Sequence, residues 1–410
     1  MSPSQQADAA ARTATATTAR EWRSPTLMLV MATLGFGLNF WAWALISPLG
    51  PAYRDDFDLS SFQQSLLVAV PVLVGSLGRI PVGALTDRLG GRLMFPLISF
   101  ATIVPVLFVA VFGDSYAAVL VGGFFLGIGG TAFAVGVPFV NAWYPPERRG
   151  FALGIFGVGM GGTAVSAFTT VKLADNFSRA VPFTIVAVVL AVYGVVAALV
   201  LRDAPGARTR TTTSFLANAW ATFKMKVTLQ MAFLYAVSFG GFVAFSVYLP
   251  TYLKNAYGLT QNGAAMRTAG FVVVAVLMRP LGGWLSDRFH PTPVLTACFG
   301  VVTALAVLAA FELALVPFGT IAFLGMAAAL GAGAGATFAL VARLSPQGKV
   351  GSVTGVVGAA GGLGGFVPPL VMGSIYGSLN DYSLGYVLLA AMAAAAALYT
   401  WFVLHPADRR

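Results

Sequence analysis

Residues 79–92 read RIPVGALTDRLGGR, and residues 279–288 read RPLGGWLSDR. The two stretches share an arginine, a glycine and an Asp-Arg pair at a constant shift of 200 positions, which relates Arg79, Gly83, Asp87 and Arg88 to Arg279, Gly283, Asp287 and Arg288. A second set of glycines recurs with a shift of 201, relating Gly150, Gly154, Gly157 and Gly161 to Gly351, Gly355, Gly358 and Gly362. The chain is therefore predicted to contain two structural repeats in the same order and direction.

The composition around these stretches is that of a membrane protein. Of 410 residues, 58% are hydrophobic and only 9% are charged, with a mean hydropathy of +0.83, whereas soluble domains carry about 25% charged residues. Apolar runs long enough to cross a bilayer, about 20 residues each, lie near 26–49, 64–85, 93–113, 117–141, 149–171, 180–201, 228–252, 265–286, 293–312, 317–342, 349–373 and 383–404. This pattern predicts an all-α membrane protein with twelve transmembrane helices in two parallel six-helix repeats.

Polar stretches divide the chain into its expected parts. We expect a disordered cytoplasmic tail (1–25), a six-helix bundle (26–201), a cytoplasmic linker (202–227), a second bundle (228–404) and a short cytoplasmic tail (405–410). With the N-terminus in the cytoplasm, seventeen lysines and arginines fall on the cytoplasmic side, against only Arg54, Lys172, Arg179, Lys254 and Arg267 on the other. The positive-inside rule then predicts a multi-pass protein of the plasma membrane with both termini in the cytoplasm.

Several classes of function lack their usual residues. The single cysteine, Cys298, excludes a disulfide framework, and the two histidines, His290 and His405, are far apart in the sequence, so neither a metal site nor a cofactor is expected. The net charge of +10 is scattered over loops, which argues against a nucleic-acid partner. A membrane enzyme would need a clustered nucleophile, base or metal set, and the sequence shows none.

Arg79 and Arg279 are the two cations that fall inside apolar spans. A charge at mid-bilayer costs about 2.5–3.5 kcal/mol on insertion scales, and every Asp and Glu lies in a tail, a loop or a helix end. The missing counter-charge should therefore come from an anionic substrate. Guanidinium offers a planar fork of donors that matches a planar oxyanion, and aromatic rings could flank such an anion.

The stretch Gly83–Arg92 resembles the signature loop of the major facilitator superfamily, and 283–288 is a weaker copy. The resemblance implies the twelve-helix fold of secondary transporters. It also implies that Asp87, Arg88, Asp287 and Arg288 form a conformational latch between helices on the cytoplasmic side.

The glycine-rich stretches GIFGVGMGGT (154–163) and GVVGAAGGLGGF (355–366) look like the paired signature helices of nitrate/nitrite porters. This resemblance implies that Arg79 and Arg279 bind the anion, that Phe133, Tyr235 and Phe239 shape its slot, and that Gly157, Gly161, Gly358 and Gly362 line the site or pack near it. Close packing of small residues between helices, and core packing of each aromatic ring, are the alternative interpretations. One position departs from the family: many nitrate porters carry an asparagine in the fifth helix where this chain has Met160, which cannot donate a hydrogen bond.

These observations predict a monomeric carrier of nitrate, nitrite or both in a prokaryotic plasma membrane, working by alternating access in nitrate assimilation. Every Asp, Glu and His lies in a tail, a loop or a helix end, so none is placed to relay a proton within the membrane, and nitrate/nitrite antiport is expected. The alternatives are a carrier of another small anion, such as cyanate or a short carboxylate, and proton-coupled nitrate uptake.

Overall fold

The computed structural model describes residues 24–145, 148–205, 220–346 and 350–408. The predicted N-terminal tail, except for its last two residues, and the middle of the predicted linker lie outside these ranges. The described part contains twelve helical segments that are long and apolar enough to span a membrane, and each overlaps one of the predicted spans. The expected all-helical membrane fold is confirmed.

Each half of the described chain contains six membrane-spanning segments, which are broken into helices at different places. The first half contains α2 (Pro25–Trp43), η1 (Ser47–Leu49), α3 (Gly50–Phe57), α4 (Ser61–Leu77), α5 (Arg79–Leu89), α6 (Gly91–Phe112), α7 (Tyr116–Gly130), α8 (Ala132–Trp143), α9 (Arg149–Gly157), η3 (Val158–Gly161), α10 (Gly162–Asn176) and α11 (Ala180–Val200). The second half contains α13 (Lys226–Tyr257), α14 (Gln261–Phe289), α15 (Pro291–Ala310), η4 (Leu315–Gly319), α16 (Thr320–Leu344), α17 (Val350–Gly364), α18 (Val367–Leu379), α19 (Ser383–Tyr399), η5 (Thr400–Leu404) and α20 (His405–Asp408).

Several helices run beyond the apolar segment that predicted them. The seventh span is one helix of 32 residues, Lys226–Tyr257, whereas the first, Pro25–Phe57, covers 33 residues but is interrupted at 44–46 between α2 and η1. Their polar ends remain helical because a helix satisfies its own backbone hydrogen bonds and can continue into water.

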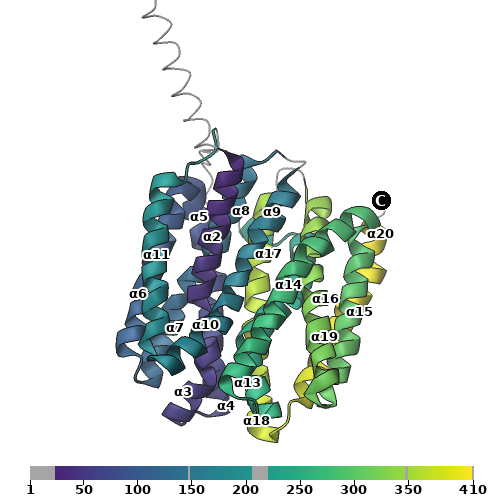
Figure 1. The fold of residues 1–410 in the computed structure, drawn as a ribbon. Coiled ribbons are helices and arrows are strands. Elements are labelled where there is room, and N and C mark those ends of the chain that lie inside the picture. Colours follow the sequence, from purple (N-terminus) through teal and green to yellow (C-terminus); the bar gives the residue numbers. More distant parts are fainter. Residues whose placement is uncertain (1–23, 146–147, 206–219, 347–349, 409–410) are drawn as a thin grey trace, which may run out of the picture.

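Figure 1 shows the two halves side by side, the first in purple to teal and the second in green to yellow. Within the first half α6 packs on α11 and α4 on α7, and within the second α14 packs on α16 and α15 on α19. Across the halves, α10 packs on α14, and α4 packs on α17 and α18. The spans that carry Arg79 and Arg279 therefore both face the interface between the halves.

Polar contacts join the halves at the end of the molecule away from the termini. Lys254 Nζ lies 2.6 Å from Asp55 Oδ2, and Gln64 Nε2 donates to Thr251 Oγ1 at 3.1 Å. Nearby, Ser47 Oγ donates to the carbonyl of Val247 at 2.7 Å. In this conformation the halves are thus held together at the end where α3 and α18 lie (Figure 1).

Candidate functional site

Arg79 and Arg279 reach the interface through different local geometry. Arg79 begins α5 directly after Gly78, which separates α5 from α4, and a Cβ on that glycine would lie 2.7 Å from the carbonyl oxygen of Val74. Arg279 lies inside the continuous helix α14, one residue before Pro280. Both side chains are almost fully buried, with 6% and 7% of their surface exposed.

The guanidinium of Arg79 crosses to the second half of the chain. Its Nη1 donates to the carbonyl oxygen of Gly358 in α17 at 2.6 Å. Its Cζ lies 5.0 Å from the ring centre of Phe133 in α8 and 5.6 Å from that of Phe239 in α13. An arginine of the second span therefore binds the glycine-rich eleventh span.

The guanidinium of Arg279 makes the reciprocal crossing. Its Nη1 donates to Met160 Sδ in η3 at 2.8 Å, so an arginine of the eighth span contacts the glycine-rich fifth span. Its Nη2 donates to the hydroxyl of Tyr235 at 2.9 Å, and its Cζ lies 5.6 Å from the ring centre of Phe239. Each arginine thus donates one hydrogen bond to the opposite half of the molecule. Each also donates one within its own half, Arg79 from Nε to the Gly130 carbonyl at 3.4 Å and Arg279 to the Tyr235 hydroxyl.

Both arginines lie near the ring of Phe239. Its ring centre lies 5.6 Å from both Cζ atoms, and it stacks on Tyr235 with ring centres 4.8 Å apart. A cation within about 6 Å of a ring face is attracted by the ring quadrupole. The structure therefore brings together all five residues that the sequence indicated as anion-binding, Arg79, Arg279, Phe133, Tyr235 and Phe239.

The sequence interpretation missed Phe338 of α16. Its ring centre lies 5.6 Å from Arg279 Cζ and 4.7 Å from the ring centre of Tyr235. Phe338 therefore stands to Arg279 as Phe133 stands to Arg79. The sequence contained a signal for Phe338, because each phenylalanine lies three residues after a glycine-rich stretch. Phe133 follows 127–130, and Phe338 follows 331–335.

Met160 points into the site because the fifth span is interrupted. Residues Val158–Gly161 form a 3-10 turn between α9 and α10, as is common where glycines weaken the α-helix. The backbone at Gly162 comes so close to α2 that a Cβ there would overlap the carbonyl oxygen of Gly37. The resulting turn buries Met160, which is 2% exposed, against Arg279.

Three of the four signature glycines lie beside an arginine. A Cβ on Gly157 would stand 3.7 Å from Arg279 Cδ, and one on Gly362 would stand 3.4 Å from Arg79 Nη1. Gly358 supplies its carbonyl to Arg79 and would place a Cβ 3.3 Å from the Phe133 ring. A Cβ on Gly161 would meet no side chain or neighbouring helix within 4 Å, so the structure shows no such contact for this glycine.

The site is electrostatically unbalanced. Neither Arg79 nor Arg279 forms an ion pair with any carboxylate in the described part of the chain. Their partners are two carbonyls, of Gly130 and Gly358, a hydroxyl, a thioether and ring faces, which satisfy some donors but carry no net negative charge. Two permanent cations in a desolvated environment favour an anion strongly.

The predicted latch residues lie elsewhere, at the ends of α5 and α14 nearer the termini. Asp87, Arg88, Asp287 and Arg288 are all exposed. Arg288 Cζ lies over the rings of Trp284 and Phe289, at 6.0 and 5.7 Å. None of the ion pairs within the described ranges involves these four residues, so their role as a latch stays a prediction.

Solved structures with the same architecture are transporters. A bacterial homologue of the human lysosomal transporter Spinster, in an inward-facing and occupied conformation, aligns with a TM-score of 0.69 and 18% identity over 93% of this chain and 97% of that one. The human organic anion transporter MFSD10 (TETRAN) aligns with a TM-score of 0.74 and 14% identity over 92% and 99% of the two chains. At these identities the likeness shows the fold alone.

Sequence relatives identify the family. The model of the Major Facilitator Superfamily matches residues 32–318 and 231–410. A probable nitrate/nitrite transporter of Mycobacterium tuberculosis, NarK2, is 50% identical over 375 residues, 91% of this chain and 95% of that protein. A nitrite extrusion protein of Bacillus subtilis is 35% identical over 372 residues, 90% and 92% of the two chains. The chain belongs to the nitrate/nitrite porter family of the major facilitator superfamily.

Proposed function

We propose that this protein carries nitrate and nitrite across the plasma membrane, with the anion held between Arg79 and Arg279. The relatives named as nitrate/nitrite transporters support the substrate. The observation that carries the proposed site is the pair of buried arginines, which have no carboxylate partner among the described residues and whose Cζ atoms each lie 5.6 Å from the ring centre of Phe239.

The free donors of the two arginines suit a small flat oxyanion. Arg79 uses Nη1 on Gly358 and Nε on Gly130, and the described residues offer no acceptor to its Nη2. Arg279 uses Nη1 on a thioether, which is a weak acceptor that an anionic oxygen can replace at low cost. The surrounding rings present flat apolar surfaces and keep water from the bound anion. A trigonal or bent anion with two or three equivalent oxygens matches this arrangement.

Exchange follows from the charge at the site. The contacts with Gly358 and Met160 require that the two halves meet around the arginines. When the empty carrier closes, two like charges enter a low-dielectric environment with only neutral partners, and this raises the barrier. A bound anion lowers that barrier on the outward and return strokes alike. Exchange of nitrate for nitrite should therefore be faster than net uptake of nitrate.

Proteoliposomes test both the substrate and the exchange. Uptake of labelled nitrate should be strongly accelerated by nitrite trapped inside and should not respond to an imposed pH gradient. Rapid uptake into anion-free vesicles, driven by an inward proton gradient, would instead establish proton-coupled nitrate uptake and reject exchange.

Met160 favours a second candidate, a carrier of another small anion. Its sulfur can neither donate to an anion oxygen nor accept strongly from Arg279. Cyanate or a short carboxylate would not need a hydrogen-bond donor at the position of Met160. Competition of nitrate, nitrite, cyanate and formate for the purified protein separates the two, because the transported anion should compete best.

A further inference from the structure

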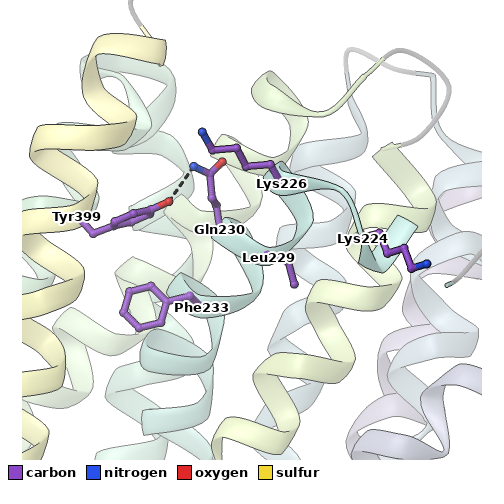
Figure 2. Close-up of a pocket in the computed structure, with 6 residues that line it drawn as sticks. All are labelled: Lys224, Lys226, Leu229, Gln230, Phe233 and Tyr399. Atoms are coloured by element: carbon purple, nitrogen blue, oxygen red, sulfur yellow. Dashed lines mark hydrogen bonds between the residues drawn. The ribbon is translucent and has the colours of Figure 1, made fainter. Parts of the chain in front are cut away.

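A pocket of about 560 Å³ lies near the termini, away from the arginines. It opens between the first turns of α13 and the end of α19, and Figure 2 shows its lining residues: Lys224, Lys226, Leu229, Gln230, Phe233 and Tyr399. Lys226 precedes Tyr235 by nine residues on α13, about 14 Å along the helix. The pocket is therefore separate from the proposed nitrate site.

The polar residues of the pocket supply donors and no negative charge. Gln230 Nε2 donates to the hydroxyl of Tyr399 at 2.8 Å, and the ammonium of Lys226 lies above this pair in Figure 2. Because the Tyr399 oxygen accepts from the amide, its own proton is free to be donated to a ligand. None of the six lining residues is acidic. This edge of the pocket suits an anionic group with several acceptor oxygens, such as a phosphodiester.

The remaining lining is apolar and open to the surroundings. Leu229 is 46% exposed, and the half-buried ring of Phe233 meets the Tyr399 ring edge-on, with ring centres 6.0 Å apart. A hydrocarbon chain could pack on these two residues below the polar edge. Free phosphate has no apolar part that could pack on Leu229 and Phe233.

Aromatic residues place the pocket at the level of lipid headgroups. Trp220, which is 61% exposed, stacks on Phe223, and Lys224 Nζ lies 5.2 Å from the Trp220 ring centre. Trp401 of η5, two residues after Tyr399, is 45% exposed. Exposed tryptophans and lysines at the ends of transmembrane helices are typical of the membrane–water interface.

We propose that this pocket binds an anionic glycerophospholipid. The phosphodiester lies against Lys226 and Tyr399, and an acyl chain follows Leu229 and Phe233. A lipid held there bridges the start of α13 and the end of α19, and so stabilises the second half of the carrier.

Binding of short-chain phosphatidylglycerol to the full-length protein in detergent tests the proposal. Native mass spectrometry counts bound lipid, and thermal unfolding measures the rise in melting temperature. Lys226→Gln should weaken binding about fivefold, since one lysine near a lipid surface contributes about 1 kcal/mol. The double variant Lys226→Gln, Tyr399→Phe should weaken it about tenfold or more. Lys172→Gln, which removes an exposed lysine far from the pocket, is the matched control and should bind like the wild type.

Two further titrations separate the sources of phosphate. Short-chain phosphatidylcholine should bind more weakly than phosphatidylglycerol, and inorganic phosphate at the same concentration should not raise the melting temperature. Equal phosphatidylglycerol binding by the double variant and the wild type would overturn the proposal, as would full stabilisation by inorganic phosphate. Nitrate binding should be unchanged in all three variants, which shows that each is folded and that the lipid pocket is independent of the nitrate site.

Discussion

Replacing Arg279 by lysine separates the charge of this side chain from its geometry. In the wild type, Nη1 reaches Met160 Sδ at 2.8 Å while Nη2 reaches the Tyr235 hydroxyl at 2.9 Å. A single ammonium cannot hold both directions at once, and it cannot present two parallel N–H groups to a planar anion. The positive charge remains, so long-range attraction for nitrate is retained.

The expected loss follows from the number of contacts removed. A hydrogen bond to a charged group contributes about 1.5–3 kcal/mol. If lysine keeps one of the two arms of the fork, nitrate affinity should fall by about 10- to 100-fold. Nitrate/nitrite exchange should fall at least as far, because the same arm also contacts the opposite half of the carrier.

Calorimetric titration of purified protein with nitrate and exchange in proteoliposomes measure the two losses. Arg267→Lys is the matched control: it makes the same change on the same helix, at an exposed side chain that only bonds back to the Gly263 carbonyl. Size-exclusion chromatography should show both variants folded. Nitrate affinity of Arg279→Lys within about twofold of the control would remove Arg279 from the anion site.

Three further substitutions test neighbouring contacts. Tyr235→Phe removes the hydroxyl that orients Arg279 but keeps the ring stack, and should weaken nitrate binding about fivefold in the same titration; full affinity would assign Tyr235 to packing alone. Met160→Asn places an amide donor beside Arg279 and should tighten nitrate binding or shift its preference against nitrite; unchanged affinity for both anions would contradict this. Gly361→Ala would make a Cβ overlap Tyr235 Cδ1 and should lower the free energy of unfolding by about 1–3 kcal/mol, whereas its control, Gly355→Ala, faces open space and should be neutral. Equal thermal stability of the two alanine variants would refute the argument from packing.

The sequence determined the features that depend on local pattern. Apolar runs of bilayer length predicted the twelve spans, because hydrocarbon admits only segments that satisfy their own backbone hydrogen bonds. The internal repeat predicted that Arg79 and Arg279 occupy equivalent places. The lack of a carboxylate within the spans predicted that both arginines would have no ionic partner, and within the described chain they have none.

Tertiary structure decided which groups the arginines contact. The Gly358 carbonyl and the Met160 sulfur come from the opposite half of the chain, 279 and 119 positions away from the arginines they bind. No periodicity within one span encodes such a pair, because it depends on how two helical surfaces dock. The 3-10 turn at Val158–Gly161 likewise lies where α10 comes close to α2. That approach turns Met160 toward Arg279, which the sequence alone left open because an α-helix through the same glycines could present another face.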